Sequence, residues 1–510
     1  MHYDTILKNG TFITMNAHGD RAQWAGIKDG KIAAVGTGQP TARDAEKTID
    51  LAGAVVLPGL MDAHVHLTPT GHFLDGVSLL DAKRIGEALH LLKERRAKTP
   101  AGEWVFGVGF MSQNMEEGRF PNRLELDEVS KEHPIMVSAQ TLHGVALNSA
   151  ALALVKVPDV AGVGRFDDGT LDGTLLSDDA AFPCMSGIMA SLPEARMRAL
   201  IERCCVYAAE KGVTTMSGLV GQFVDEDKDV DLVLKHSASF PVNINVFYQT
   251  WELEKVKRLN LPRIGGCLTL DGAGFEYTMA LGEPYPQRPE RRGFLIHTDE
   301  EIYTLISAAH RENIQCALHA LGDRAIDQLL YVFLQVIGEQ GRKDLRHRIE
   351  HFSLPTDKHM DLAVDLGLVL SMQPAFSGLW GQPDGGYYEL LLGRERADRM
   401  ECFDEIVKRG GIVCGGSDSP VSLIDPLYGL ACCINNPDPR RNVSVTEAIK
   451  IFTRNTAYAM HLEAEKGSIE VGKDADLTVI DRNPYDLADS PEIYDMKVLM
   501  TMKGGTITYE

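Results

Sequence analysis

The 510-residue chain lacks any apolar run long enough to cross a bilayer, so we expect no membrane as a partner. Its first residues, MHYDTILKNG, lack the basic stretch and apolar core of a signal peptide, and we expect a chain without one. Positive charge is also scarce: 51 lysines and arginines stand against 72 aspartates and glutamates, a net charge of −21. Binding of nucleic acid needs clustered Lys and Arg, so we expect no nucleic acid as a partner.

Cysteine is sparse as well. Nine cysteines, an odd number scattered over a long chain, do not indicate a disulfide framework, and we expect reduced thiols in a cytoplasmic protein. The 44% of hydrophobic and 24% of charged residues are ordinary for a soluble globular chain. Because 510 residues exceed what one compact core holds, we expect one large domain with additions, or two to three domains.

Both ends of the chain have the pattern of strands joined by tight turns. The N-terminal runs TILKNGTFITM and QWAGIKDGKIAAVG carry the hairpin signals NG and DG. The C-terminal runs ADLTVID and KVLMTMKGGTITYE have the same character. We therefore expect one β-sandwich domain composed of residues 1–57 and 464–510.

The middle of the chain alternates between helical periodicity and short apolar runs. Apolar residues recur at helical spacing in two segments, Met197 to Ala208 and Ile326 to Ile337, and Leu334 belongs to the predicted buried face of the second. Eight short runs are typical of buried strands: LMDAHVHL, GVTTMSG, VNINVFY, GGCLTLDG, IQCALHA, RHRIEHF, LVLSMQP and GIVCGGSD. Eight strands alternating with helices predict a (β/α)8 TIM barrel over residues 58–463, in the α/β class. The first two strands lie too far apart for one crossover, so we expect an insertion at about residues 68–211, which includes HPIMVSAQTLHGVALNS.

Histidine and aspartate recur at the ends of these predicted strands. Successive alternate positions of a strand share one face, so His64 and His66 project together with Asp62. His319, His351 and Asp418 end three later strands, and active sites of barrels form at the carboxyl ends of the strands. Any one of these residues alone could be a core histidine or a helix cap. Together they indicate a metal site, because imidazole and carboxylate suit zinc and neighbouring divalent metals.

The order of these residues resembles that of the amidohydrolase superfamily, and most closely its YtcJ-like branch, the amidohydrolase 3 family. The segments that carry the resemblance are PGLMDAHVHL, LHALGDRAID, RHRIEHF, SMQPAF, GGSDSPV and KGSIEVGKDADLTVID. The resemblance implies a metal-bearing barrel, a composite sandwich, a large insertion after the first strand, and hydrolysis of a carbon–nitrogen bond. It also implies that His64, His66 and Asp418 hold a buried metal. His319 and His351 would hold a second metal, or one of them would orient the substrate carbonyl.

The fourth predicted strand, GGCLTLDG, departs from the family pattern. Many relatives have a carboxylated lysine there that bridges two metals, and the matching residue is Cys267. Three interpretations stay open: a thiolate that ligates or bridges metals, a mononuclear site with Cys267 nearby, or a small core residue.

Five further residues are candidates for substrate binding. His143 and Asn148 lie in LHGVALNS, a segment near the barrel mouth in relatives, where a turn with a helix cap is the alternative. Gln373 ends the seventh strand, and Trp380 lies in a glycine-rich loop that could close over the mouth. Glu276 follows the fourth strand and either lines the pocket or is a solvated loop residue.

Together with these patterns, the resemblance implies a metal-dependent hydrolase that acts on a non-peptide carbon–nitrogen bond of a small molecule, in an amide, a formamide or a cyclic amide. We expect one or two divalent ions, with zinc as the first choice, and a homodimer as the candidate assembly. Asp418 would take a proton from the attacking water and pass it to the leaving nitrogen, while His319 or His351 stabilises the carbonyl oxygen. A ring-amine deaminase, an esterase or lactonase, and a scaffold without activity remain the alternatives.

Overall fold

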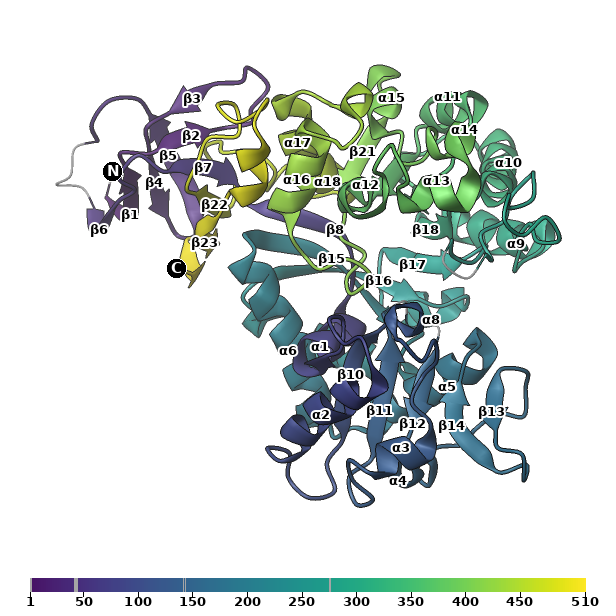
Figure 1. Ribbon diagram of the computed structural model, residues 1–510. Coiled ribbons are helices and arrows are strands. Elements are labelled where there is room, and N and C mark those ends of the chain that lie inside the picture. The colour runs from purple at the N-terminus through teal and green to yellow at the C-terminus, as the bar shows by residue number, and fades with distance from the viewer. Residues whose placement is uncertain (1, 41–44, 141, 143, 275–276) are drawn as a thin grey trace. The chain divides into compact units, whose positions relative to one another are not determined.

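The computed structural model describes residues 2–40, 45–140, 142, 144–274 and 277–510 (Figure 1). The chain forms two compact units, one of Met1–Val65, Cys205–Leu219 and Ser237–Glu510, the other of His66–Cys204 and Val220–His236. Among the helices of the described residues, none has the length and apolar character needed to cross a membrane.

The first unit contains the predicted barrel. Eight strands form one sheet in which spatial order follows chain order, from β8 through β15 to β21. The strands are β8 (Leu60–His66), β15 (Val213–Gly221), β16 (Asn243–Gln249), β17 (Arg263–Thr269), β18 (Gln315–Ala320), β19 (Arg348–His351), β20 (Val369–Met372) and β21 (Ile412–Gly415). They correspond one to one to the eight apolar runs, and the predicted α/β barrel class is confirmed.

The first and last strands meet at their carboxyl ends. Val65 and Ser419 form a parallel bridge, and the Asp418 amide donates to the His64 carbonyl at 2.9 Å. Gly416 permits this approach, because a Cβ there would lie 2.7 Å from the Cβ of His64. The glycine pair in GGSD therefore allows the predicted ligands to come together from opposite ends of the sheet.

Helices follow the barrel strands as the alternation predicts. They are α8 (Leu253–Arg258), α9 (Asp299–Arg311), α10 (Asp323–Gln340), α11 (Asp357–Leu366), α12 (Pro374–Trp380), α13 (Tyr387–Leu392), α14 (Arg394–Ala397), α15 (Phe403–Lys408), α16 (Pro426–Ile434), α17 (Val445–Ile451) and α18 (Arg454–Ala459). One detail of α10 differs from the predicted apolar face. Leu334 is exposed, and Val332 and Val336 are buried in its place, so the buried face is rotated toward these valines.

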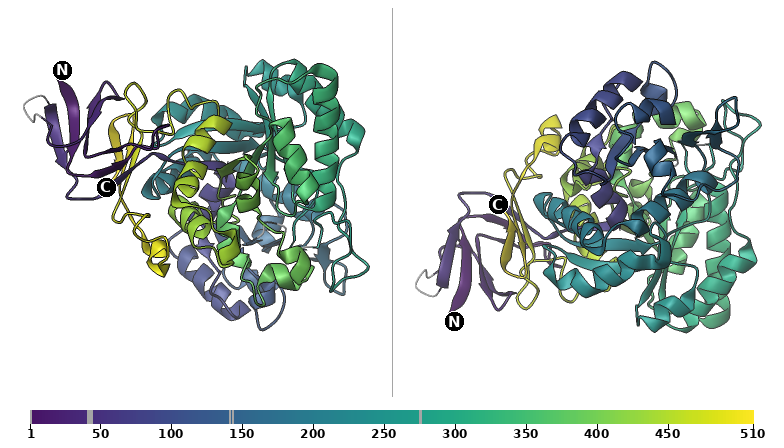
Figure 2. Two further views of the ribbon diagram at one scale, coloured as in Figure 1. Left: turned by 90° about the horizontal axis from the view of Figure 1, so that it is seen from above. Right: turned by 90° about the horizontal axis from the view of Figure 1, so that it is seen from below.

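Strands from both ends of the chain form the sandwich, as predicted. One sheet has the order β5-β4-β1-β6, and the other has the order β24-β23-β22-β7-β2-β3. In Figure 2 the purple N-terminal and yellow C-terminal strands lie side by side, and β7 pairs with both β2 and β22. The strands are β1 (Tyr3–Lys8), β2 (Thr11–Ile13), β3 (Arg21–Ala22), β4 (Trp24–Lys28), β5 (Lys31–Gly36), β6 (Ala45–Asp50), β7 (Val55–Pro58), β22 (Leu477–Ile480), β23 (Val498–Lys503) and β24 (Thr506–Tyr509).

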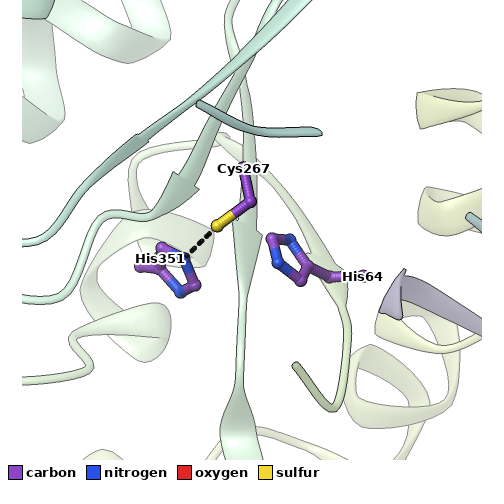
Figure 3. A group of neighbouring side chains, drawn as sticks. All are labelled: His64, Cys267 and His351. Atoms are coloured by element: carbon purple, nitrogen blue, oxygen red, sulfur yellow. Dashed lines mark hydrogen bonds between the residues drawn. The ribbon is translucent and has the colours of Figure 1, made fainter. Parts of the chain in front are cut away.

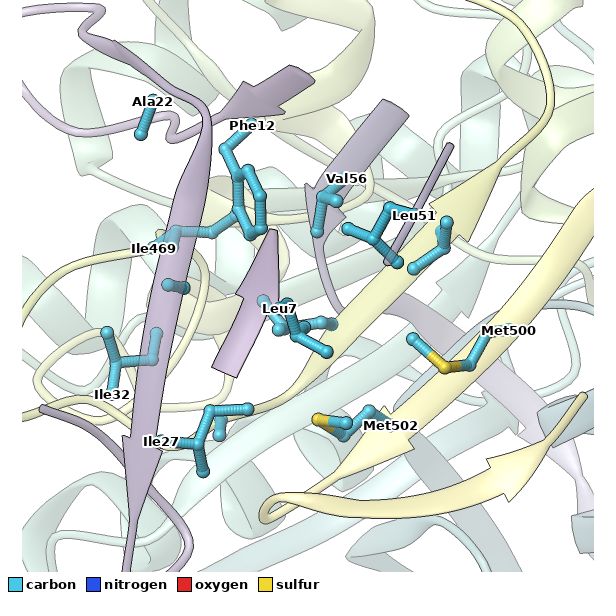
Figure 4. Packing of buried hydrophobic residues seen from close by; sticks show 14 of the residues in the cluster. Leu7, Phe12, Ala22, Ile27, Ile32, Leu51, Val56, Ile469, Met500 and Met502 are labelled. Atoms are coloured by element: carbon cyan, nitrogen blue, oxygen red, sulfur yellow. The ribbon is translucent and has the colours of Figure 1, made fainter. Parts of the chain in front are cut away.

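The core of the sandwich is shared between the two ends of the chain. Leu7, Phe12 and Ile27 of the N-terminal part pack with Met500 and Met502 of the C-terminal part (Figure 4). Apolar side chains at alternate positions of each strand supply this core, since one face of each sheet is buried.

The second unit contains its own mixed sheet, with the order β13-β14-β12-β11-β10-β9. Its residues 66–204 and 220–236 overlap the expected insertion of about 68–211. The strands are β9 (Val77–Ser78), β10 (Val105–Phe110), β11 (Ile135–Ala139), β12 (Val145–Leu147), β13 (Val163–Arg165) and β14 (Leu171–Leu175). The helices are α1 (Leu67–Asp75), α2 (Ile85–Arg96), α3 (Arg123–Asp127), α4 (Ser149–Leu152), α5 (Asp178–Ser191), the first part of α6 (Glu194–Glu210) and α7 (Lys228–His236).

Candidate metal centre

Four barrel strands bring His64, Cys267, His319 and His351 together at their carboxyl ends. The Cys267 Sγ lies 3.6 Å from the His319 Nδ1 and 3.6 Å from the His351 Nε2. One ligand atom each from His64, Cys267 and His351 lies within 4.8 Å of the other two, and Figure 3 shows the three side chains pointing toward one another. All of these side chains are buried.

An irregularity in β17 accompanies the position of Cys267. Pairing with β18 shifts register between Gly265 and Leu268, and both Gly265 and Gly266 have positive φ, +93° and +105°. A Cβ at Gly265 would lie only 2.1 Å from the Ala317 carbonyl oxygen, so glycine is required there. The structure thus places Cys267 against two of the predicted histidines.

Asp418 reaches the same group from the end of β21. Its Oδ1 lies 3.3 Å from the His64 Nε2. The Asp418 backbone has a φ of 58°, in the left-handed region that aspartate tolerates better than most residues. Strained backbone of this kind often marks functional sites, and His351, with a φ of 72°, shares it.

A buried ion pair holds the other side of His64. The Glu350 Oε2 lies 2.6 Å from the His64 Nδ1, and Arg348 donates to both oxygens of Glu350 at 2.7 and 2.9 Å. Burial opposes a charge on His64, but contacts with Asp418, Cys267 and Glu350 outweigh it and raise the pKa of the imidazole above its usual value. Glu350 thus fixes the Nδ1–H tautomer and directs the Nε2 of His64 toward Asp418.

His351 is oriented by Gln373, a residue predicted to contact substrate. The Gln373 Oε1 accepts a hydrogen bond from the His351 Nδ1 at 2.9 Å, which leaves Nε2 facing Cys267. Gln373 is fully buried and lies just after β20. In the structure this glutamine contacts a candidate ligand.

His319 is flanked by Asp271, which follows β17. The Asp271 Oδ1 lies 3.4 Å from the His319 Nε2, and the same carboxylate accepts from the backbone amides of Ala280, Leu321 and Gly322. Burial opposes a charge on His319, yet contacts with Asp271 and Cys267 raise its pKa to about 10. Asp271 therefore connects His319 to the loops after β17 and β18.

Asp62 connects the two ends of the sheet beneath the site. Its Oδ1 accepts from the backbone amides of His64 and Ser417, both at 3.0 Å. Burial raises the pKa of this carboxyl to about 6, although these hydrogen bonds oppose the shift. Asp62 thus supports the strand ends.

Five further residues were predicted for the site. His66 ends β8, two residues beyond His64. The Asn148 side chain caps α4 through the Ala151 amide and contacts the backbone at Ile135, Ser130 and His133, which is the helix-cap alternative. Trp380 packs at the end of α12 beside Phe376 and Tyr388. The remaining two, His143 and Glu276, lie outside the described residues.

Three residues of the site escaped the sequence interpretation: Arg348, Glu350 and Asp271. The first two alternate within RHRIEHF, and a pair of charges in a buried strand was the signal that could have identified them. Asp271 is the aspartate of GGCLTLDG. Its contact with His319 depends on the loops after β17 and β18, which periodicity does not predict.

Comparison with known proteins agrees with this geometry. A model of the amidohydrolase family matches residues 47–509. Putative amidohydrolase YtcJ of Bacillus subtilis is 26% identical over 99% of both chains, and N-substituted formamide deformylase of Arthrobacter pascens is 26% identical over 99% of this chain and 98% of its own. An uncharacterized metal-dependent hydrolase from Pyrococcus furiosus has 25% identity and a TM-score of 0.79, covering 94% of this chain and 99% of its own. The chain therefore belongs to the amidohydrolase family.

Proposed function

We propose that this chain is a divalent-metal-dependent hydrolase that cleaves the carbon–nitrogen bond of a small amide or formamide. One observation carries the proposal: buried imidazole, thiol and carboxylate groups converge at the carboxyl ends of the barrel strands. The full-length similarity to a relative named as an N-substituted formamide deformylase supports the choice of bond.

The donor set fits a divalent ion. His64, Cys267 and His351 offer two nitrogens and one sulfur within 4.8 Å of one another, and such borderline-soft donors favour zinc. His66 joins this proposed ligand set because it lies two residues beyond His64 on β8. An ion held there would supply Lewis-acid catalysis and would lower the pKa of a water molecule.

The residues around the donors have separate tasks in the proposed reaction. Asp418 accepts a proton from the attacking water and later donates it to the leaving nitrogen. Arg348 and Glu350 keep the His64 ring in one tautomer, and Gln373 does the same for His351. His319, held by Asp271, donates a hydrogen bond to the carbonyl oxygen as negative charge develops there.

Removal of metal tests the proposal directly. Dialysis against a chelator should abolish hydrolysis of N-alkylformamides, and zinc, cobalt or manganese should restore it. Elemental analysis of the protein as purified, after chelation and after reloading gives the number of ions that accompany activity. Full turnover by protein that contains no metal would exclude the proposal.

The products identify the bond that is cleaved. A panel of N-alkylformamides, N-acyl amines, cyclic amides, aminopyrimidines and simple esters should yield an amine from the amides. Ammonia from the ring amines alone would indicate a deaminase, and turnover of the esters alone would indicate an esterase. Either result would replace the amide assignment while keeping the metal site.

A further inference from the structure

Helix α10 has apolar residues on its outer side as well as on the side that packs against the barrel. Tyr331 and Leu334 are 56% and 46% exposed, whereas Val332 and Phe333 between them are buried. The helix lies between α9 and α11 (Figure 1), and its outer face stays exposed. The outer face of a helix in a monomer is normally polar, so this second apolar side indicates a contact that one copy of the chain does not supply.

The exposed residues of α10 form one narrow stripe. It consists of Asp327, Tyr331, Leu334, Gly338 and Arg342, spaced by three or four residues, and all five are exposed. Residues at this spacing share one side of a helix, and Arg342 follows directly after the helix ends. The stripe therefore has an acidic end, an apolar middle with a glycine, and a basic end.

Both charged ends of the stripe lie on the side of α10 that faces α11. The Asp327 Oδ1 lies 3.5 Å from the His359 Nε2, and Arg342 donates to the Asp365 carbonyl, both on α11. The Asp327 side chain nevertheless stays 82% exposed. A two-fold rotation about an axis that runs across α10, in the plane of the contact, keeps this side in place and exchanges the two ends. It therefore brings the acidic end of each copy to the basic end of the other.

The middle of the stripe is complementary to itself under the same rotation. Asp327 meets Arg342 of the partner subunit when the axis passes beside Leu334. This register sets Tyr331 opposite Gly338 of the partner subunit. A Cβ at Gly338 would meet no atom of the described residues within 4 Å, so the surface above it has room for the ring. Small side chains allow helices to approach closely, and Leu334 then packs against Leu334 of the partner subunit at the axis.

We propose that two copies of this chain associate through α10, with the two helices antiparallel about a two-fold axis beside Leu334. The partner is a second copy because one stripe supplies both halves of every contact: acid and base, ring and glycine, leucine and leucine. A single helix buries less than the about 800 Å² per partner of a standard interface, so the dimer should dissociate at micromolar concentrations.

The oligomeric state tests the proposal first. Sedimentation velocity of the full chain should show a monomer–dimer equilibrium between about 1 and 200 µM. Leu334→Asp should raise the dissociation constant about a hundredfold or more, because each copy loses a leucine that the contact buries. Val471→Asp changes another exposed apolar residue, outside α10, and should leave the equilibrium unchanged. A monomer at every concentration, or a dimer that Leu334→Asp does not weaken, would overturn the proposal.

An exchange of charges tests the antiparallel register. Asp327→Arg and Arg342→Asp each bring like charges together at two symmetric places, and each should weaken the dimer about tenfold. The double variant restores an opposite pair at both places and should return to within about threefold of the wild type. Losses that add up in the double variant would exclude this register and the proposal with it.

A disulfide tests the position of the two-fold axis. The nine native cysteines are buried, so a cysteine introduced on the stripe is the accessible one. Leu334→Cys should form a disulfide-linked dimer under mild oxidation, at a concentration where the wild type is dimeric, because the two sulfurs meet at the axis. Val471→Cys is the control and should stay unlinked. Absence of the linked dimer in Leu334→Cys, or equal linking of both variants, would contradict the proposed axis.

Discussion

Cys267 is the residue that decides the composition of the metal centre. Its Sγ lies 3.6 Å from nitrogens of two histidines, a position that a core cysteine does not need. A coordinating thiol is deprotonated, and such thiolates bind zinc strongly. The strand pattern alone left open whether Cys267 lies near the histidines, and the structure places its sulfur against His319 and His351.

Cys267→Ser tests whether the thiolate is a ligand. The variant should bind less metal per chain or bind it more weakly, while its far-ultraviolet circular dichroism stays unchanged. Cys316→Ser is the matched control, because Cys316 is a fully buried cysteine of the neighbouring strand β18 and is not one of the predicted ligands. It should lose some stability and keep its metal. Equal metal affinity in Cys267→Ser and the wild type would remove Cys267 from the ligand set.

Asp418 is the proposed proton acceptor, and an amide in its place cannot take up the proton. Asp418→Asn should therefore lower kcat by about a hundredfold or more at unchanged melting temperature. Steady-state kinetics of the two variants are compared, because Asp361→Asn changes an exposed aspartate of α11 in the same way. A rate within a few-fold of the wild type would assign the proton transfer to another group.

At the scale of elements, the strands were easier to predict than their surroundings. Eight apolar runs became the eight barrel strands because strands covered on both faces are continuously apolar. His64, His319 and His351 were found because each ends such a run. Gln373 was not assigned to its observed contact, since one hydrogen bond to a distant histidine leaves no periodic signal.

The helical face of α10 shows the limit of periodicity. The spacing selected Leu334 for the core, but Val332 and Val336 are buried in its place on a helix that contacts both α9 and α11. A helix with apolar residues around much of its circumference fits more than one orientation. The neighbours decide among these orientations, and they are not visible within a single segment.

A chain of three hydrogen bonds connects β18 and α9 through His347, which directly precedes β19. The Cys316 amide donates to the His347 Nδ1 at 2.9 Å, and His347 donates through Nε2 to the His310 Nδ1 at 3.0 Å. His310 in turn donates to the Gly341 carbonyl at 3.0 Å. Burial lowers the pKa of His347 from 6.5 to about 3, so the folded state keeps this ring neutral.

Acid should therefore destabilise the fold through His347. Below about pH 6.5 the unfolded chain takes up a proton that the folded chain refuses, so the free energy of unfolding falls as the pH drops toward 3. The loss is at most about 1.4 kcal/mol for each pH unit. His347→Gln, which does not titrate, should show a smaller drop in melting temperature between pH 7.5 and 5. His90→Gln, an exposed control, should follow the wild type, and parallel pH profiles of all three proteins would contradict the assignment.

At the scale of the whole chain, the C-terminal strands secure the start of the barrel. The Leu60 amide at the beginning of β8 donates to the Thr478 Oγ1 at 3.0 Å, and that hydroxyl donates to the Gly212 carbonyl at 2.6 Å. Thr501, which faces Thr478 on β23, donates to the Ala209 carbonyl at 2.7 Å. The composite sandwich thus holds the first strand of the barrel, which carries His64, and the turn that precedes the second strand.

Thr478→Val tests this link, because it keeps the shape and removes the hydroxyl. The Leu60 amide and the Gly212 carbonyl would both lose a buried partner, at a cost of about 1–3 kcal/mol of unfolding free energy. Thr478→Ser keeps the hydroxyl and should lose less, and Thr501→Val breaks one bond and should fall between the two. Hydrogen exchange at the Leu60 amide should accelerate in Thr478→Val. Equal melting temperatures for Thr478→Val and Thr478→Ser would show that packing of the methyl groups, and not the hydroxyl, secures β8 to the C-terminal strands.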